Sequence, residues 1–106
     1  MADRISMDDF VGRHGDDVTV VDVREADEYV SGHVPGAIFA PMSNITPHLA
    51  ALPRDEVVYV ICRSGQRSQA MADLMVAQGI RAVSIDGGTM AWINAGQPVV
   101  EGRTPR

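Results

Sequence analysis

Residues 57–68 read Val57-Val58-Tyr59-Val60-Ile61-Cys62-Arg63-Ser64-Gly65-Gln66-Arg67-Ser68. The apolar run at the start predicts a strand buried in a sheet, and the residues after Gly65 follow a helical pattern. Cys62, the only cysteine among 106 residues, therefore lies where a strand passes through a short loop into a helix. The backbone amides of such a loop and the helix N-terminus direct positive potential at one point. This arrangement favours a thiolate over a thiol.

The side chains of the same loop predict anion binding. The guanidinium groups of Arg63 and Arg67 keep their protons and suit a planar or tetrahedral oxyanion. We therefore interpret Cys62 as a nucleophile that is followed by a substrate-binding and anion-binding loop. That loop consists of Arg63, Ser64, Gly65, Gln66, Arg67 and Ser68. The alternative is that Cys62 is a small buried hydrophobic residue at a strand end, as many lone cysteines are.

Size, charge and cysteine count limit the class of protein. A chain of 106 residues with 45% hydrophobic content is expected to form one domain, 1–106, with a core over about residues 3–100 and a loose tail at 101–106. The net charge of -5 disfavours nucleic acid and anionic membrane surfaces, which are bound through basic patches. No stretch approaches the length of a membrane span. A single cysteine excludes an internal disulfide and a multi-thiolate metal site, and it suits a reducing, cytoplasmic compartment.

Strands and helices are expected to alternate along the chain. The predicted strands are 18–23, 37–40, 57–61 and 82–85. Three predicted helices begin at cap residues, namely Ser6, Ser43 or Asn44, and Thr89, and a short helical turn is predicted at 26–30. The helix after Gly65 is expected to end at Gly79 and to bury Ala70, Met71, Leu74 and Met75. This alternation predicts an α/β fold with a parallel sheet between two layers of helices. Such sheets bind ligands beyond the carboxyl ends of their strands.

Five segments, taken in order, carry a family resemblance. They are Asp22-Val23-Arg24, Glu28-Tyr29 leading to Gly32-His33-Val34-Pro35-Gly36-Ala37, the loop 62–68, Asp86-Gly87-Gly88, and Trp92 followed by Gly96-Gln97-Pro98-Val99. Each segment is weak evidence alone, but the ordered set spans nearly the whole chain and resembles the rhodanese-like domain, a family of single-domain sulfurtransferases. The resemblance implies a three-layer α/β fold with a central parallel five-stranded sheet. It also implies no metal and no organic cofactor.

The resemblance further implies that Cys62 is the catalytic residue of a thiosulfate sulfurtransferase and carries sulfur as a persulfide. A small anionic donor such as thiosulfate, or a protein persulfide, is expected to supply the sulfur. A thiol, a protein or cyanide is expected to accept it. The loop amides from Arg63 to Ser68 are placed to bind the anionic outer sulfur. Arg63 and Arg67 are expected to hold the oxyanion end of the donor.

Other polar residues near strand ends are expected to support the site. Asp22 and Arg24 can pair with each other or brace the Cys62 loop. We expect bracing rather than a direct part in the chemistry, because persulfide transfer needs no carboxylate base. His33 is expected to form a structural hydrogen bond, and Glu28 to anchor the turn around it. Trp92 is expected to pack on the sheet.

Two alternatives use the same fold. A regulatory or docking module would be marked by a missing cysteine or a degraded loop, and neither is found in residues 62–68. A phosphatase of this fold has one more residue between cysteine and arginine, whereas four residues separate Cys62 from Arg67. The tighter ring favours a sulfur-sized ligand over phosphate. Arsenate reductases usually enlist a further thiol, which this chain lacks. The oligomeric state is not predicted.

Overall fold

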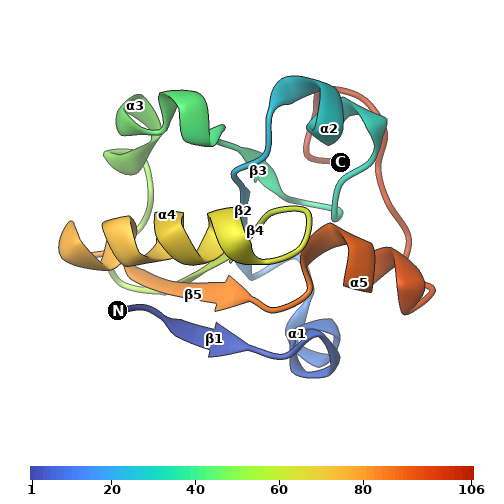
Figure 1. The fold of residues 1–106 in the computed structure, drawn as a ribbon, viewed down its shortest axis with the longest axis horizontal. Helices are drawn as coiled ribbons and strands as arrows, with labels where there is room; N and C mark the ends of the chain where they lie inside the picture. Colours follow the sequence, from blue (N-terminus) through green and yellow to red (C-terminus); the bar gives the residue numbers. More distant parts are fainter.

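A five-stranded parallel sheet with helices on both faces forms the core of the protein in a computed structural model of residues 1–106 (Figure 1). The strands are β1 (Asp3–Ile5), β2 (Thr19–Asp22), β3 (Ile38–Phe39), β4 (Val57–Ile61) and β5 (Arg81–Ile85). The helices are α1 (Met7–Arg13), α2 (Ala26–Ser31), α3 (Thr46–Leu49), α4 (Gln66–Ala77) and α5 (Gly88–Asn94), with a 3-10 turn at Met42–Asn44. The strand order β1-β5-β4-β2-β3 confirms the predicted three-layer α/β fold.

The middle strand, β4, is apolar on both faces because helices cover both. Val58 and Val60 belong to the core that includes residues of α3 and α4, whereas Tyr59 and Ile61 belong to the core that includes residues of α1, α2 and α5. Successive side chains of a strand point to opposite faces, so an uninterrupted apolar run suits a strand between two helical layers. Cys62 continues this alternation on the α4 side, which brings its side chain to the start of that helix.

Aromatic packing fixes α5 against the other face of the sheet. Phe10 of α1 packs against Tyr59 and Trp92, with ring centroids 5.5 and 5.7 Å apart. Trp92 is buried, as predicted, and its indole N–H donates to the Pro98 carbonyl at 2.7 Å. Such aromatic contacts add to the free energy gained by burial. They hold α5 where its first turn reaches the Cys62 loop.

One of two predicted helix caps is present in the structure, and the other is not. Ser6 caps α1, as expected, because its hydroxyl accepts a hydrogen bond from a first-turn amide. The prediction that Ser43 or Asn44 caps the helix that includes Leu49 is wrong. That helix, α3, begins after Ile45 without a side-chain cap, and the Ser43 hydroxyl donates instead to the Glu25 carboxylate at 2.6 Å.

The longest helix, α4, packs Met71, Leu74 and Met75 against the core, as predicted, but the prediction for Ala70 is wrong. Ala72 is buried where Ala70 was expected to be, and Ala70 is exposed. The reason lies at the start of the helix, where Ser68 must face the sheet to reach Cys62, so the buried stripe runs through Ser68, Ala72 and Met75. At 12 residues, even this helix cannot cross a membrane, and no other helix is long and apolar enough to do so.

The first strand, β1, was not predicted. Only Ile5 of its three residues is buried, and Asp3 and Arg4 are charged and exposed, so the segment lacks the apolar run of an interior strand. It forms through tertiary pairing at the edge of the sheet, where Asp3 lies opposite Val83 and Ile5 opposite Ile85.

The segment 101–106 is not a loose tail, contrary to our expectation. One ring nitrogen of the buried His33 lies 2.8 Å from the Thr104 carbonyl oxygen, and the Gly36 amide donates to the Pro105 carbonyl at 2.8 Å. These hydrogen bonds hold the segment against the turn at residues 32–37. The structural role predicted for His33 is thereby confirmed.

Deleting residues 103–106 is expected to lower the free energy of unfolding by about 1–3 kcal/mol, because the buried His33 and the half-buried Gly36 lose hydrogen-bond partners. Urea denaturation followed by circular dichroism measures the change. The control is Arg106→Ala, which removes an exposed ion pair with Asp16 and is expected to cost about 0–1 kcal/mol. A deletion no more destabilising than this control would contradict the structural role of the segment.

Candidate active site

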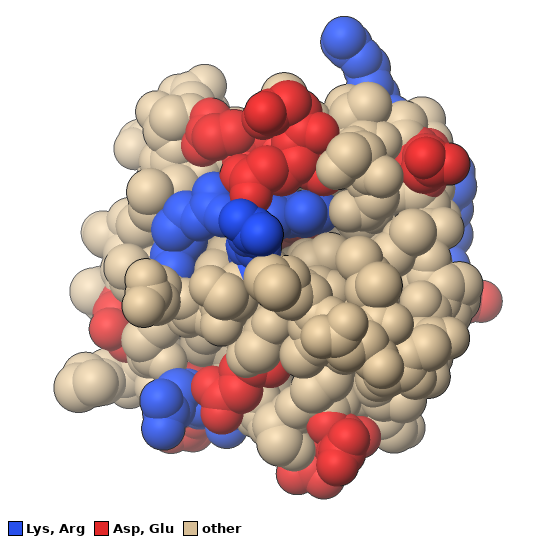
Figure 2. All heavy atoms as spheres, turned by 45° about the vertical axis from the view of Figure 1, so that its right-hand side comes forward, with Lys and Arg blue, Asp and Glu red and all other residues tan.

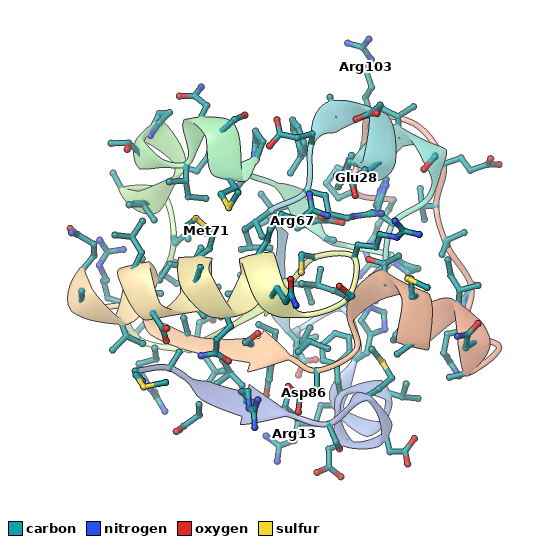
Figure 3. All side chains as sticks on the ribbon, in the orientation of Figure 1. Arg13, Glu28, Arg67, Met71, Asp86 and Arg103 are labelled. Atoms are coloured by element: carbon teal, nitrogen blue, oxygen red, sulfur yellow. The ribbon has the colours of Figure 1, made fainter.

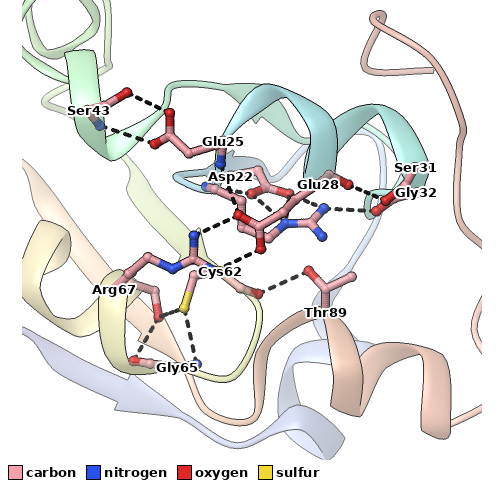
Figure 4. Close-up of polar contacts among 12 residues, drawn as sticks. Asp22, Glu25, Glu28, Ser31, Gly32, Ser43, Cys62, Gly65, Arg67 and Thr89 are labelled. Atoms are coloured by element: carbon pink, nitrogen blue, oxygen red, sulfur yellow. Dashed lines mark hydrogen bonds and ion pairs between the residues drawn. The ribbon is translucent and has the colours of Figure 1, made fainter.

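The Cys62 loop connects the middle strand to the longest helix. Cys62 follows β4 directly, and α4 begins at Gln66. Gly65 closes the loop with φ +116°, in the left-handed region that favours glycine. This turn directs the Gly65 amide at the sulfur, with 3.1 Å between N and Cys62 Sγ. The sulfur therefore lies inside the ring of the loop, in a residue that is only 1% exposed (Figure 4).

Two serine hydroxyls form a chain of polar contacts from the Cys62 sulfur to strand β5. Ser68 Oγ lies 3.5 Å from Cys62 Sγ and 2.9 Å from Ser84 Oγ, and both serines are buried. The Cys62 thiol donates to Ser68 Oγ, and the Ser68 hydroxyl donates to the Gly65 carbonyl at 3.0 Å. When the thiol loses its proton, the Ser68 hydroxyl can turn and donate to the sulfur. Sequence reasoning did not single out Ser84. It could have been noticed as the one hydroxyl in the run 82–85 of β5, because a buried polar atom requires a hydrogen-bond partner.

These surroundings lower the pKa of Cys62 below its ordinary value. Burial acts in the opposite direction, because it disfavours the charged thiolate. The Ser68 hydroxyl and the backbone amides of Ser68, Gly65 and Ser64 together outweigh that effect by stabilising the thiolate. The thiolate is thus stabilised chiefly by hydrogen-bond donors of the loop rather than by a neighbouring cation.

The first turn of α5 holds the loop from outside. The amide and the hydroxyl of Thr89 both donate to the Cys62 carbonyl, at 2.8 and 3.0 Å, and the Met90 amide donates to the Arg63 carbonyl at 3.1 Å. Gly88, with φ +59°, permits this approach, because a Cβ there would lie 2.5 Å from both carbonyl oxygens. Thr89, which we predicted to be a helix cap, therefore anchors the loop instead.

Arg67 is paired with an acidic residue of α2. Its guanidinium forms a two-point ion pair with the Glu28 carboxylate, with N–O distances of 2.7 and 2.9 Å (Figure 3). The hydrogen bonds from Arg67 lower the pKa of Glu28 to about 2 against the opposing effect of burial, so this carboxylate is ionised at neutral pH. We had expected Glu28 to anchor the turn near His33. That expectation is wrong, because Glu28 contacts Arg67 and the Glu25 amide.

Arg63, in contrast, is exposed and takes part in none of the ion pairs. It borders a hollow of about 290 Å³ together with Glu28 and the apolar side chains of Met90, Ile93 and Val99. On this side of the molecule, basic side chains form a band that acidic side chains border (Figure 2). The charge of Arg63 is therefore available to a ligand in the hollow.

The remaining loop side chains lie at a different place. Ser64, Gly65 and Gln66 line a second hollow together with Arg4 and Asp86. Asp86 follows directly after β5, at the same edge of the sheet as Cys62. It faces Arg4, at 3.8 Å, and Figure 3 shows it beyond the end of β5.

Asp22, the last residue of β2, and Arg24 form a buried ion pair at the end of that strand. The Arg24 guanidinium donates to both carboxylate oxygens of Asp22, at 2.9 to 3.1 Å. It also donates to the Gly32 carbonyl at 2.8 Å, which ties the strand end to the end of α2. The pair thus braces α2, the helix that presents Glu28. No three His, Cys, Asp or Glu side chains are grouped to hold a metal ion.

Comparison with known proteins agrees with this geometry. The chain matches the family model "Rhodanese-like domain" over residues 6–95. A sulfurtransferase from Allochromatium vinosum is 36% identical over 86 residues, which cover 80% of this chain and 80% of that protein. The thiosulfate sulfurtransferase GlpE from Pseudoalteromonas translucida is 34% identical over 87 residues, covering 81% of this chain and 83% of that protein.

A solved structure supports the same assignment. The crystal structure of a rhodanese-related protein from Thermoplasma volcanium has a TM-score of 0.86 and 34% sequence identity, and it covers 92% of this chain and 97% of that chain. The protein therefore belongs to the family of rhodanese-like domains, as the sequence resemblance implied. Its relatives place it with the sulfurtransferase-type rhodaneses.

Replacing Ser68 by alanine is expected to raise the pKa of Cys62, because the thiolate loses a hydroxyl donor. Alkylation by iodoacetamide, followed across pH, measures this. The thiolate is the reactive form and predominates above the pKa, so the wild-type midpoint should lie below the ordinary value of about 8.5. In Ser68→Ala the midpoint should move upward and the rate at pH 7 should fall about fivefold. Ser64→Ala, which removes an exposed hydroxyl, is the control, and an equal shift in both variants would contradict the role of Ser68.

Gly88→Ala is expected to destabilise the protein by more than about 2 kcal/mol, because a Cβ at positive φ also collides with two carbonyl oxygens. The same change should alter the rate of Cys62 alkylation, since the loop must move. Gly79→Ala is the matched control: Gly79 also has positive φ, +85°, but a Cβ there meets nothing within 4 Å. Its cost should be limited to about 1 kcal/mol. Equal effects of the two substitutions on stability and alkylation would rule out the close approach of α5.

Proposed function

We propose that this protein accepts sulfane sulfur from thiosulfate or a protein persulfide as a Cys62 persulfide and passes it to a thiol or to cyanide. One observation carries the proposal: donors of a short loop converge on the sulfur. The Gly65 amide donates to Cys62 Sγ at 3.1 Å, and Ser68 Oγ, 3.5 Å from the sulfur, accepts from the thiol and can donate to the thiolate. Such a ring stabilises a thiolate before the reaction and an anionic persulfide after it.

The first half-reaction loads the cysteine. The Cys62 thiolate attacks the outer sulfur of thiosulfate, and a sulfur–sulfur bond forms between them. The sulfur–sulfur bond of thiosulfate breaks, and sulfite leaves with its electron pair. Total charge is conserved, because a thiolate and a dianion become an anionic persulfide and a sulfite dianion. No external oxidant or reductant is required.

The second half-reaction empties the cysteine. A thiolate or cyanide attacks the terminal sulfur of the persulfide and takes it, and Cys62 leaves as the thiolate that began the cycle. The leaving thiolate is stabilised by the same loop donors that lower the pKa of Cys62. A low pKa therefore assists both the attack of Cys62 at neutral pH and its departure.

The arginines of the loop have unequal roles in this proposal. Arg63 has no ion-pair partner and borders the hollow beside the loop, so we assign to it the binding of the oxyanion end of a donor. Arg67 is paired with Glu28, and it contributes to the potential around Cys62 rather than as a free oxyanion ligand. The relatives named sulfurtransferase and thiosulfate sulfurtransferase support this type of activity.

Incubation with thiosulfate followed by intact mass measurement tests the proposal. We expect a gain equal to one sulfur atom, and loss of that gain on addition of cyanide or a thiol. Cys62→Ser keeps the loop but removes the nucleophile, and it should show no gain. Absence of the adduct in the wild-type protein, or its survival in Cys62→Ser, would refute the proposal.

A further inference from the structure

We propose that Glu28 is a specificity-determining residue of the Cys62 site, which disfavours dianionic sulfur donors and favours organic persulfides that carry fewer negative charges. This inference rests on the proposed function, because it concerns which donor loads Cys62. It reverses what the two loop arginines suggest on their own, namely a site selected for a dianion such as thiosulfate.

The first support is that the guanidinium of Arg67 is already hydrogen-bonded to Glu28. A guanidinium recognises an oxyanion best through two parallel N–H groups. In Arg67 the two terminal nitrogens, at 2.7 and 2.9 Å, already donate to the two oxygens of Glu28 (Figure 4). A sulfonate-like group would have to displace this carboxylate to gain the same two bonds.

The second support is the persistence of the negative charge. The side chain of Glu28 is only 27% exposed, so solvent screens it less than a surface carboxylate. Its pKa is lowered to about 2, and it is therefore anionic throughout the neutral range. The amide of Glu25 also donates to it, at 3.2 Å, as part of the capping box that opens α2. Glu28 is thus held in place by its own helix as well as by Arg67.

The third support is the charge balance of the hollow that Arg24, Glu28 and Arg63 line. Three arginines lie in or near it, but Arg24 is neutralised by Asp22 and Arg67 by Glu28. Only Arg63 retains an uncompensated positive charge. A persulfide anion balances this single charge, whereas thiosulfate brings one negative charge too many, because Glu28 already compensates the charge of Arg67.

The lining of the same hollow favours an organic group. Met90 and Ile93 of α5 and the nearby Val99 border it, and their side chains are 45, 51 and 38% exposed. A carbon-bearing persulfide can cover this apolar surface and gain from its burial. Thiosulfate has no carbon atoms and gains nothing there.

The favoured step is balanced in atoms and electrons. The bound persulfide anion first takes up a proton from solvent and becomes R–S–SH. The Cys62 thiolate then attacks its outer sulfur, the donor sulfur–sulfur bond breaks, and the thiolate R–S⁻ leaves with the electron pair. Cys62 keeps the transferred SH unit as its persulfide. The donor thiol is released in its reduced form, so no further redox partner is needed.

Single-turnover loading of Cys62, followed by intact mass, tests this role with two donors. The donors are thiosulfate and 2-hydroxyethyl persulfide, which has no charged group apart from its persulfide. Glu28→Gln keeps the shape of the side chain and removes its charge. We expect it to raise the rate constant for thiosulfate about tenfold, the effect of one unit charge on a nearby dianion. The rate constant for the persulfide should rise by no more than about threefold, since that donor carries half the charge.

Asp27→Asn is the matched control, because Asp27 is an exposed acid in the same helical turn that forms no ion pair with Arg67. It should change neither rate constant by more than about twofold, as expected for a charge screened by solvent. Glu28→Ala is a second variant without the charge, and circular dichroism verifies that each variant is folded. A purely structural role of Glu28 would slow both donors alike.

Three results would overturn the inference. An unchanged ratio of thiosulfate to persulfide rate constants in both Glu28 variants is one. An equal rise of that ratio in Asp27→Asn is another. Failure of the wild-type protein to load from either donor would overturn the proposed function and this inference with it, whereas the first two results leave the proposed function standing.

Discussion

The close approach of Gly88 to the Cys62 loop is the constraint on which the site depends. Thr89 and Met90 take up the carbonyl groups of Cys62 and Arg63, so these carbonyls point toward α5. The C=O and N–H of a planar trans peptide point in opposite directions, and the amides that follow are therefore turned toward the other side of the loop, where the sulfur lies. A side chain at position 88 would separate the two segments. The neighbouring positions of β4 and β5 in the sheet bring them together.

The sequence predicts those parts of the fold in which a strand is buried on both faces or in which a local sequence pattern defines a helix. The strand at 57–61 follows from its uninterrupted apolar run, and the helix after Gly65 follows from its apolar periodicity. The short strand β1 could not be predicted, because its pairing with β5 is purely tertiary and its residues are mostly charged. The segment 101–106 was missed for the same reason, since its partner residues at 32–37 lie far away in the chain.

The sequence was sufficient to predict which residues form the site, but not which of their charges are paired. Cys62 and the loop that follows it could be recognised from residue types and spacing. The partner of each arginine could not, because Glu28 and Arg67 are 39 positions apart and meet only when α2 packs beside the loop. Counting cationic side chains in a motif therefore overestimates the positive field at the sulfur. Only the folded chain shows which charges are already compensated.

The two borders of the sheet have a consequence for how copies of this chain behave at high concentration. β1 has three residues, of which Asp3 and Arg4 carry opposite charges, and β3 has only two residues. A border this short offers few free backbone groups to a strand of another molecule, and charged side chains on it oppose such pairing. The protein thus keeps its long, apolar strands in the interior of the sheet, where they cannot template the growth of intermolecular β-structure.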